Sequence, residues 1–196
     1  MRKFFGLFMA IVLSSLMTGC GYNTIQQLDE EVSSNWSEVL NQYKRRADLV
    51  PQLVKVVQGY ASHEKEVFTA VTEARSKAGS ISLTPEALKD PQAMENFAKA
   101  QSQMTSALSR LLAVSERYPE LKANEQFRDL QSQLEGTENR ITVARNRYID
   151  SIKQYNVVIR KFPSNITAKV FDYNVKPQFN VEDQASVTKA PEINFK

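Results

Sequence analysis

The chain has 196 residues, of which 24% are charged and 42% hydrophobic, and it contains one Cys, one Trp and one His. This length is sufficient for a domain with its own hydrophobic core. The formal net charge is only +3, which excludes the strongly basic surface typical of proteins that bind nucleic acid. A single Cys also excludes an intramolecular disulfide.

Residues 1–19 are predicted to be a signal peptide. A basic pair, an apolar run over residues 4–17 and two small residues precede Cys20, which is the order found in export signals. The apolar run is shorter than the roughly 20 residues that span a bilayer. The alternative is an uncleaved membrane anchor with an incidental Cys20.

Cys20 is predicted to carry lipid. It stands where a bacterial lipoprotein box places the lipid-bearing Cys, with Thr18 and Gly19 as the small residues before it, although Met17 replaces the usual Leu. Several acyl chains, which bacterial lipoprotein processing supplies, anchor a protein firmly. We therefore expect residues 20–24 to be a lipidated tether and the rest of the chain to face the cell envelope outside the cytoplasm. Gly21 in place of Asp favours the outer membrane where the organism has one.

Apolar residues recur at steps of three and four over residues 25–78, which predicts amphipathic helix. Pro51 interrupts this stripe, and because the stripe continues in phase we expect a kink or tight break there. Gly59 is interpreted as a place of close packing against another backbone. Residues 79–92 form a break, with a short turn of helix at 85–89 and a long helix from Pro91.

A second striped stretch, residues 94–162, predicts two helices joined by a corner. Pro119 should end the first helix near Tyr118, and Asn124 should cap the second. The stripes are expected to face each other, Leu108 and Leu111 against Leu130 and Leu134. The predicted fold is all-α, an elongated antiparallel bundle of three to four long helices over residues 25–173, followed by an irregular, flexible tail over residues 174–196.

No catalytic, cofactor-binding or metal-binding residue is predicted. His63-Glu64 lacks the second His, four residues later, that a zinc protease helix needs, because Val67 stands there. Ser115 has no base partner except the one His of the chain. Carboxylates of loops do not show the spacing of a Ca²⁺ site.

Three polar or aromatic features are given structural roles. Glu138 is expected to make a buried hydrogen bond or ion pair with Arg140, Arg145 or another helix. Residues 44–46 are interpreted as a solvated or salt-bridged basic face rather than as a lipid headgroup site. Trp36 falls on the apolar stripe and is expected in the core.

Several ordered blocks resemble the LemA family, and together they cover roughly residues 22–171. The resemblance implies an all-helical protein held to a membrane by its N-terminus, although many members carry a membrane helix there instead of a lipoprotein-like start. No catalytic residue is established for the family. Its genes often lie beside membrane proteins with a TPM domain or membrane metallopeptidases, which implies such partners. The blocks are Tyr43–Val54, Gly59–Glu64, Leu108–Asn124, Thr137–Ile141, Tyr155–Asn156 and Phe162–Pro163.

These observations favour a membrane-anchored, non-enzymatic scaffold or adaptor of the bacterial cell envelope, held to the membrane by the lipid on Cys20. Its working surface would be an amphipathic groove that receives a helix or an extended peptide. One alternative is an accessory protein that binds lipid or cell-wall fragments in a cavity between helices. Another is a hydrolase, for which the sequence shows no converging set of catalytic groups. The cavity of the carrier would be lined by Tyr43, Tyr60, Tyr148 and Tyr155.

Overall fold

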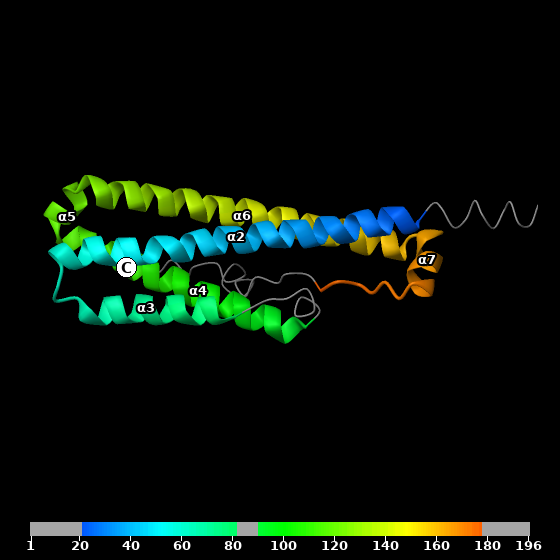
Figure 1. The fold of residues 1–196 in the computed structure, drawn as a ribbon, viewed down its shortest axis with the longest axis horizontal. Helices are drawn as coiled ribbons and strands as arrows, with labels where there is room; N and C mark the ends of the chain where they lie inside the picture. Colours follow the sequence, from blue (N-terminus) through cyan, green and yellow to red (C-terminus); the bar gives the residue numbers. More distant parts are fainter. Residues whose placement is uncertain (1–20, 82–89, 178–196) are drawn as a thin grey trace, which may run out of the picture. The chain divides into compact units, whose positions relative to one another are not determined.

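In a computed structural model, residues 21–81 and 90–177 are described, and all of their regular secondary structure is helical. The predicted all-α class is confirmed, with four long helices that pack together in the described part of the chain (Figure 1). The signal peptide, Cys20, the helical turn expected at 85–89 and residues 178–196 lie outside the described residues. The elements are α2 (Tyr22–Tyr60), α3 (Lys65–Ser80), α4 (Pro91–Val114), the 3-10 turn η2 (Ser115–Arg117), α5 (Pro119–Ala123), α6 (Glu125–Arg160) and α7 (Ser164–Val170).

The described chain forms two compact units, and both α2 and α6 contribute to each. The first unit comprises residues 21–43 and 139–177, and the second comprises residues 44–81 and 90–138. Each unit is therefore assembled from segments that are far apart in the sequence.

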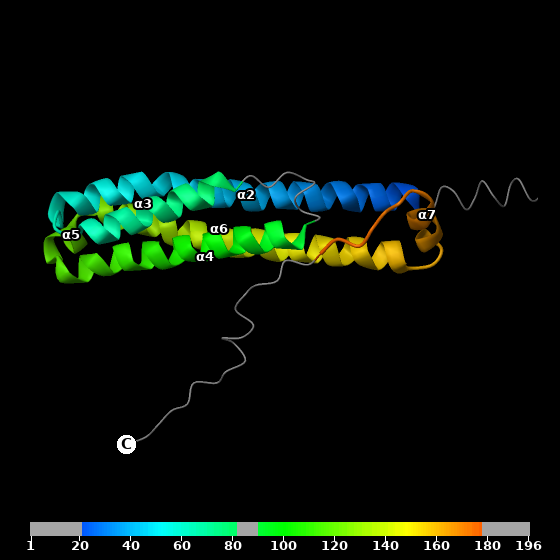
Figure 2. The same ribbon diagram turned by 90° about the horizontal axis from the view of Figure 1, so that it is seen from below.

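The core of the second unit is a cluster of apolar side chains from α2, α3, α4, α5 and α6. Leu108 and Leu111 of α4 lie in the same cluster as Leu130 and Leu134 of α6, and each is at most 4% exposed. The predicted meeting of these two stripes is confirmed. Burial of a Leu side chain contributes about 1.5–3 kcal/mol, so this cluster is the main source of stability of the unit. Helix α3 runs alongside α4 (Figure 2).

Pro51 lies inside α2, which continues on both sides of it. No wide loop is present there, as predicted. Because Pro has no backbone N–H, it leaves the carbonyl of Ala47, four residues earlier, without its helical partner. Arg75 of α3 compensates, since its Nε donates to the Ala47 oxygen at 2.9 Å. The proline is thus accommodated by a neighbouring helix.

The chain reverses at Ala61–Glu64, between α2 and α3, and the sequence pattern did not predict this corner. The apolar spacing continues through the corner, because Ala61 in the corner and Phe68 in the first turn of α3 stand seven apart and are both buried. The interpretation of Gly59 was wrong: a Cβ there would meet nothing within 4 Å, so no backbone of the described segments approaches it closely.

The second corner follows the prediction closely. Helical structure ends at Arg117, because Tyr118 before Pro119 takes a non-helical backbone conformation. The Oδ1 of Asn124 accepts a hydrogen bond from the backbone N–H of Phe127 at 2.9 Å and so caps α6. At the start of α4, Asp90 caps in the same way, accepting from the Gln92 N–H at 2.9 Å.

In the first unit part of α2 packs against part of α6, and α7 is followed by residues 171–177 of the same unit. Trp36 is 4% exposed and its ring lies 4.9 Å from that of Tyr148, so its predicted place in the core is confirmed. After α7 the chain turns back, with Asp172 in the left-handed region at φ 56° and the Tyr173 N–H bonded to the Ala168 oxygen. This is the Schellman arrangement that satisfies the last carbonyls of a helix.

The hydrogen bond from Arg75 to the Ala47 carbonyl predicts that the effects of changes at residues 51 and 75 on the free energy of unfolding are coupled. Arg75→Met keeps the aliphatic stem but removes the donor, and should lower the free energy of unfolding by about 0.5–1.5 kcal/mol in the otherwise native chain. In a Pro51→Ala background the backbone N–H restored at position 51 takes over the Ala47 carbonyl, so the same change should cost clearly less. Urea denaturation of the four proteins of this cycle gives the coupling. Equal losses in both backgrounds would show that Arg75 does not compensate for the proline.

Candidate functional site

The first described residue, Gly21, lies in close contact with α7. A Cβ built on Gly21 would stand 3.2 Å from the Cα and Oγ of Ser164 and 3.3 Å from the Oγ1 of Thr167. A larger residue at this position would force backbone of α7 to move. The residue that follows Cys20 is therefore held against the folded part of the chain, although Cys20 itself lies outside the described residues.

Arg46 is the most buried charged group of the second unit, with 2% of its side chain exposed. Its Nη1 donates to Glu138 Oε1 of α6 at 3.0 Å and to Thr105 Oγ1 of α4 at 2.9 Å. Its Nη2 donates to Gln101 Oε1 of α4 at 2.6 Å. One guanidinium thus connects three helices through charge-assisted hydrogen bonds.

This network settles the roles of two predicted features. The expected ion pair of Glu138 with another helix exists, and its partner is Arg46. The basic run at residues 44–46 is divided: Lys44 and Arg45 are exposed, whereas Arg46 is buried and paired. The interpretation as a solvated face is confirmed for Lys44 and Arg45, whereas Arg46 is salt-bridged in the interior rather than on a face.

The residues that the sequence analysis considered for catalysis or metal binding do not form a site in the structure. His63 is exposed in the turn between α2 and α3. The Oγ of Ser115 donates to the Leu112 carbonyl at 2.7 Å, which is a local helix-end contact. Within the described residues no hydrogen bond links His63, Ser115 and Glu138, and no group of three or more His, Cys, Asp or Glu side chains is placed to hold a metal ion.

The two corners of the second unit contact each other through polar side chains. Glu64 pairs with Arg117 at 3.0 Å and accepts from the Tyr118 hydroxyl at 3.4 Å. The amide of Asn124 donates to the Tyr60 hydroxyl at 3.0 Å. Blocks of the sequence that carry the family resemblance therefore meet here, and their role at this point is to join two turns.

In the first unit, Lys176 is held by contacts with α2 and α6. The side chain of Asn156 pairs with the backbone of Lys176 in both directions, each bond measuring 2.9 Å. Lys176 in turn forms an ion pair with Asp29 at 2.7 Å, and its Nζ lies 5.0 Å from the centre of the Tyr155 ring. The start of the expected tail is thus bound to α2 and α6. The sequence contained one signal for it, the Tyr155-Asn156 block.

Three tyrosines of the first unit have a raised pKa, and for Tyr173 the causes are burial and the hydrogen bond with the Tyr22 side chain. Burial raises the pKa of Tyr148 to about 12. Burial, together with the negative charge of Asp29, raises the pKa of Tyr155 to about 12 as well. The hydroxyls of Tyr148 and Tyr155 therefore stay protonated to a more alkaline pH than an ordinary tyrosine does.

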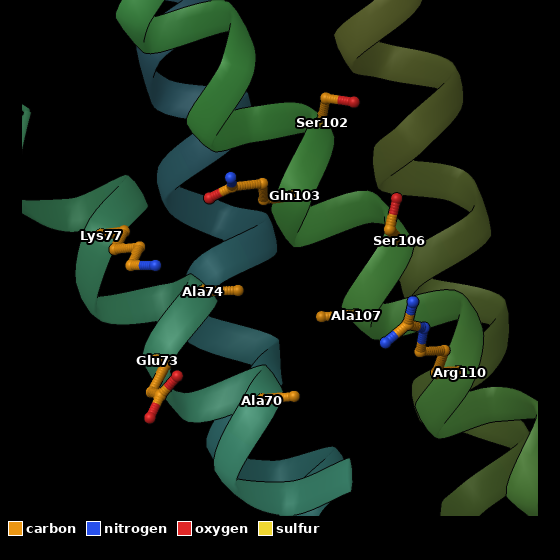
Figure 3. Close-up of a pocket in the computed structure, with 9 residues that line it drawn as sticks. All are labelled: Ala70, Glu73, Ala74, Lys77, Ser102, Gln103, Ser106, Ala107 and Arg110. Atoms are coloured by element: carbon orange, nitrogen blue, oxygen red, sulfur yellow. The ribbon is translucent and has the colours of Figure 1, made fainter.

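A surface groove lies between α3 and α4 in the second unit and has a volume of about 280 Å³. Ala74 and Ala107 point toward each other across it, and Lys77 and Gln103 extend from opposite sides (Figure 3). Small residues stand four apart on both helices, Ala70 and Ala74 on α3, and Ser102 and Ser106 on α4. Glu73 and Arg110 complete the lining. Five of the nine lining residues are Ala or Ser, which leaves room for a partner to approach between the four longer side chains.

A second hollow, of about 330 Å³, lies in the first unit and is lined in part by Asn156 and Lys176. Neither hollow is lined by the tyrosines that a carrier was expected to use. Tyr60 is 40% exposed, whereas Tyr43, Tyr148 and Tyr155 are buried in the packing of the helices. None of the helices in the described part of the chain is long and apolar enough to span a membrane.

Comparison with known proteins finds a family model and several relatives that resemble the chain. The profile described as LemA family matches residues 35–195. Magnetosome protein MamQ 2 of Paramagnetospirillum magneticum is 27% identical over 163 residues, covering 75% of this chain and 60% of the relative. Protein LemA of Metamycoplasma hominis is 26% identical over 157 residues, covering 78% of this chain and 66% of the relative. The chain thus spans about 60% of the length of its MamQ relative.

The Arg46 network predicts an asymmetry between neighbouring arginines. Arg46→Lys keeps the charge but cannot reach Gln101, Thr105 and Glu138 together, so it should lower the free energy of unfolding by about 1.5–3 kcal/mol. Arg45→Lys, one residue away and exposed, should change it by less than about 0.5 kcal/mol. Urea denaturation measures both, with an unchanged slope expected. Equal effects at the two positions would contradict the network.

Proposed function

Because the chain belongs to the LemA family, we propose that it is a membrane-anchored, non-enzymatic helical scaffold or adaptor of the bacterial cell envelope. The α3–α4 groove is the observation that carries this proposal. Its volume, its small-residue lining and its position between two neighbouring helices suit it to receive a helix of another protein.

The occupant that fits best is a helix of a membrane-protein partner. Small residues repeated at steps of four allow two helices to approach closely, and such stripes are common in helices of membrane proteins. Glu73 lies on one side of the groove and Lys77 and Arg110 offer positive charge, so the partner helix should carry acidic side chains beside a narrow apolar stripe. A TPM-domain protein or a membrane metallopeptidase are the partner classes that the family resemblance implies.

The membrane attachment is the lipid on Cys20, after removal of residues 1–19. With a lipid at this position the two folded units face the space outside the cytoplasm. Gly21 rather than Asp at the next position favours the outer membrane in a bacterium with two membranes. The tether is shorter than the expected residues 20–24, because Gly21 packs on Ser164 and residues 22–24 belong to helix α2.

The absence of enzymatic activity belongs to the same proposal. It is supported by the structural contacts of the polar side chains that were considered for catalysis. Glu138 forms an ion pair with Arg46, and Glu64 forms one with Arg117. The Ser115 hydroxyl donates to the Leu112 carbonyl. Groups committed to structural contacts of this kind are poor candidates for acid–base or nucleophilic chemistry.

The anchor is tested by Cys20→Ser in bacteria that express the full chain. The native protein should show a mature N-terminus at Cys20 with attached acyl chains in mass spectrometry. The variant should accumulate as a precursor that retains residues 1–19, because cleavage of lipoproteins depends on the modified Cys. An intact N-terminus with unmodified Cys20 in the native protein would reject the lipid anchor.

The groove is tested by crosslinking in intact cells. A photoreactive side chain at position 106, which lines the groove, should capture a membrane-protein partner, whereas the same group at Ser109 should not. Ser109 is a matched control, since it is also an exposed Ser of α4 but does not line the groove. Crosslinks of equal yield at both positions, or at neither, would argue against docking in this groove.

A further inference from the structure

Four large apolar side chains remain exposed at the end of the first unit, and we call them the α7 face. The exposed fractions are 68% for Phe162, 52% for Ile166, 72% for Val170 and 56% for Phe171. Ile166 and Val170 stand four apart and so share one side of α7. Apolar side chains gathered in this way are typical of an interaction surface.

The rest of α7 is fastened to the unit. Ala168 is 3% exposed, so the side of the helix that bears it is buried. Gly21 packs on Ser164 and Thr167, and the Tyr22 ring lies 4.9 Å from that of Phe171. Helix α7 is therefore a fixed element of the first unit, and it lies beside the first turn of α2 (Figures 1 and 2).

Charges around the α7 face are mainly positive. Arg160, Lys161 and Lys169 are exposed, and Asp172 is the one acid between residues 160 and 172. None of the three basic side chains forms an ion pair within the described residues. Exposed apolar side chains flanked by basic ones are the combination that binds anionic lipid surfaces.

The peptide bond between Cys20 and Gly21 indicates that a membrane covers the α7 face. Cys20 is bonded to Gly21, and consecutive Cα atoms across a trans peptide are about 3.8 Å apart. Since Gly21 touches α7, acyl chains on Cys20 enter the membrane next to the α7 face. If residues 1–19 were instead an uncleaved membrane anchor, the chain would also emerge from the membrane next to α7.

We propose that the α7 face lies in the headgroup region of an anionic membrane, so that the protein is held by a docked surface as well as by its tether. This inference rests on the membrane attachment in the proposed function and deepens it. A docked surface fixes the orientation of the first unit toward the membrane, which a flexible tether alone does not.

The test uses the full chain, purified from bacterial membranes and reconstituted in vesicles of phosphatidylglycerol and phosphatidylethanolamine. A fluorophore is coupled to a new thiol in Ile166→Cys or, as the control, in Val143→Cys. Both positions carry exposed aliphatic side chains of the first unit, 52% and 49% exposed. Val143 lies on α6, about 25 Å before the end of that helix.

Lipids with brominated acyl chains should quench the probe at position 166 several-fold more than the probe at position 143. Iodide, which quenches from the water, should quench the probe at position 143 more than the probe at position 166. In vesicles of neutral phosphatidylcholine the quenching at position 166 by brominated lipid should fall, because the basic side chains lose their counter-charge.

Two results would overturn the inference. Iodide quenching at position 166 equal to that at position 143 would mean that the α7 face is in water. Protection at position 166 from both quenchers would mean that protein covers the face, either residues 178–196 or a second copy of the chain.

Mass spectrometry of the same samples separates this inference from the anchor. Unmodified Cys20 would reject the lipid anchor, and the quenching would then be repeated in a Cys20→Ser background, where it still reports on the α7 face. Lipidated Cys20 with a water-exposed position 166 would overturn the inference and leave the anchor intact.

Discussion

The ion pair and hydrogen bonds of Arg46 constrain how three helices of the second unit are placed along one another. Removing a guanidinium from water is costly unless its donors are paired. Its partners come from α4 and α6, so those helices must present Gln101 and Glu138 at one level of α2. Displacement of either helix by one turn, about 5.4 Å, would separate the charge from its partners. The apolar cluster supplies most of the stability, whereas Arg46 selects one register.

Compensation between helices recurs elsewhere in the structure. Pro51 removes a backbone donor, and Arg75 of another helix supplies the missing hydrogen bond. The corner at Ala61–Glu64 has no capping side chain for α3, yet Glu64 is held by Arg117 and Tyr118 of the second corner. Residues that weaken one helix locally are thus accommodated by contacts from its neighbours, because a long helix in a bundle is stabilised mainly by packing.

The two units carry different kinds of surface. The second unit offers a groove with small residues and charges of both signs, which suits a protein helix. The first unit offers bulky exposed apolar residues near basic ones, which suits a lipid surface. Neither surface gathers a nucleophile, a base and an oxyanion donor, which is the combination that acyl-transfer chemistry needs. Both surfaces are suited to binding, as the proposed adaptor role requires.

Sequence patterns alone determined the helical class, the facing stripes and the start of a long helix at Pro91, because stripes and helix-start signals act within a turn or two of one helix. They did not indicate the corner at Ala61–Glu64, since the apolar spacing runs through it unchanged. They also did not distinguish buried Arg46 from its exposed neighbours. Its partners Gln101 and Glu138 are 55 and 92 residues away. Only the tertiary structure decided which polar side chains are buried together, because burial of a charge depends on groups that the fold brings from distant parts of the chain.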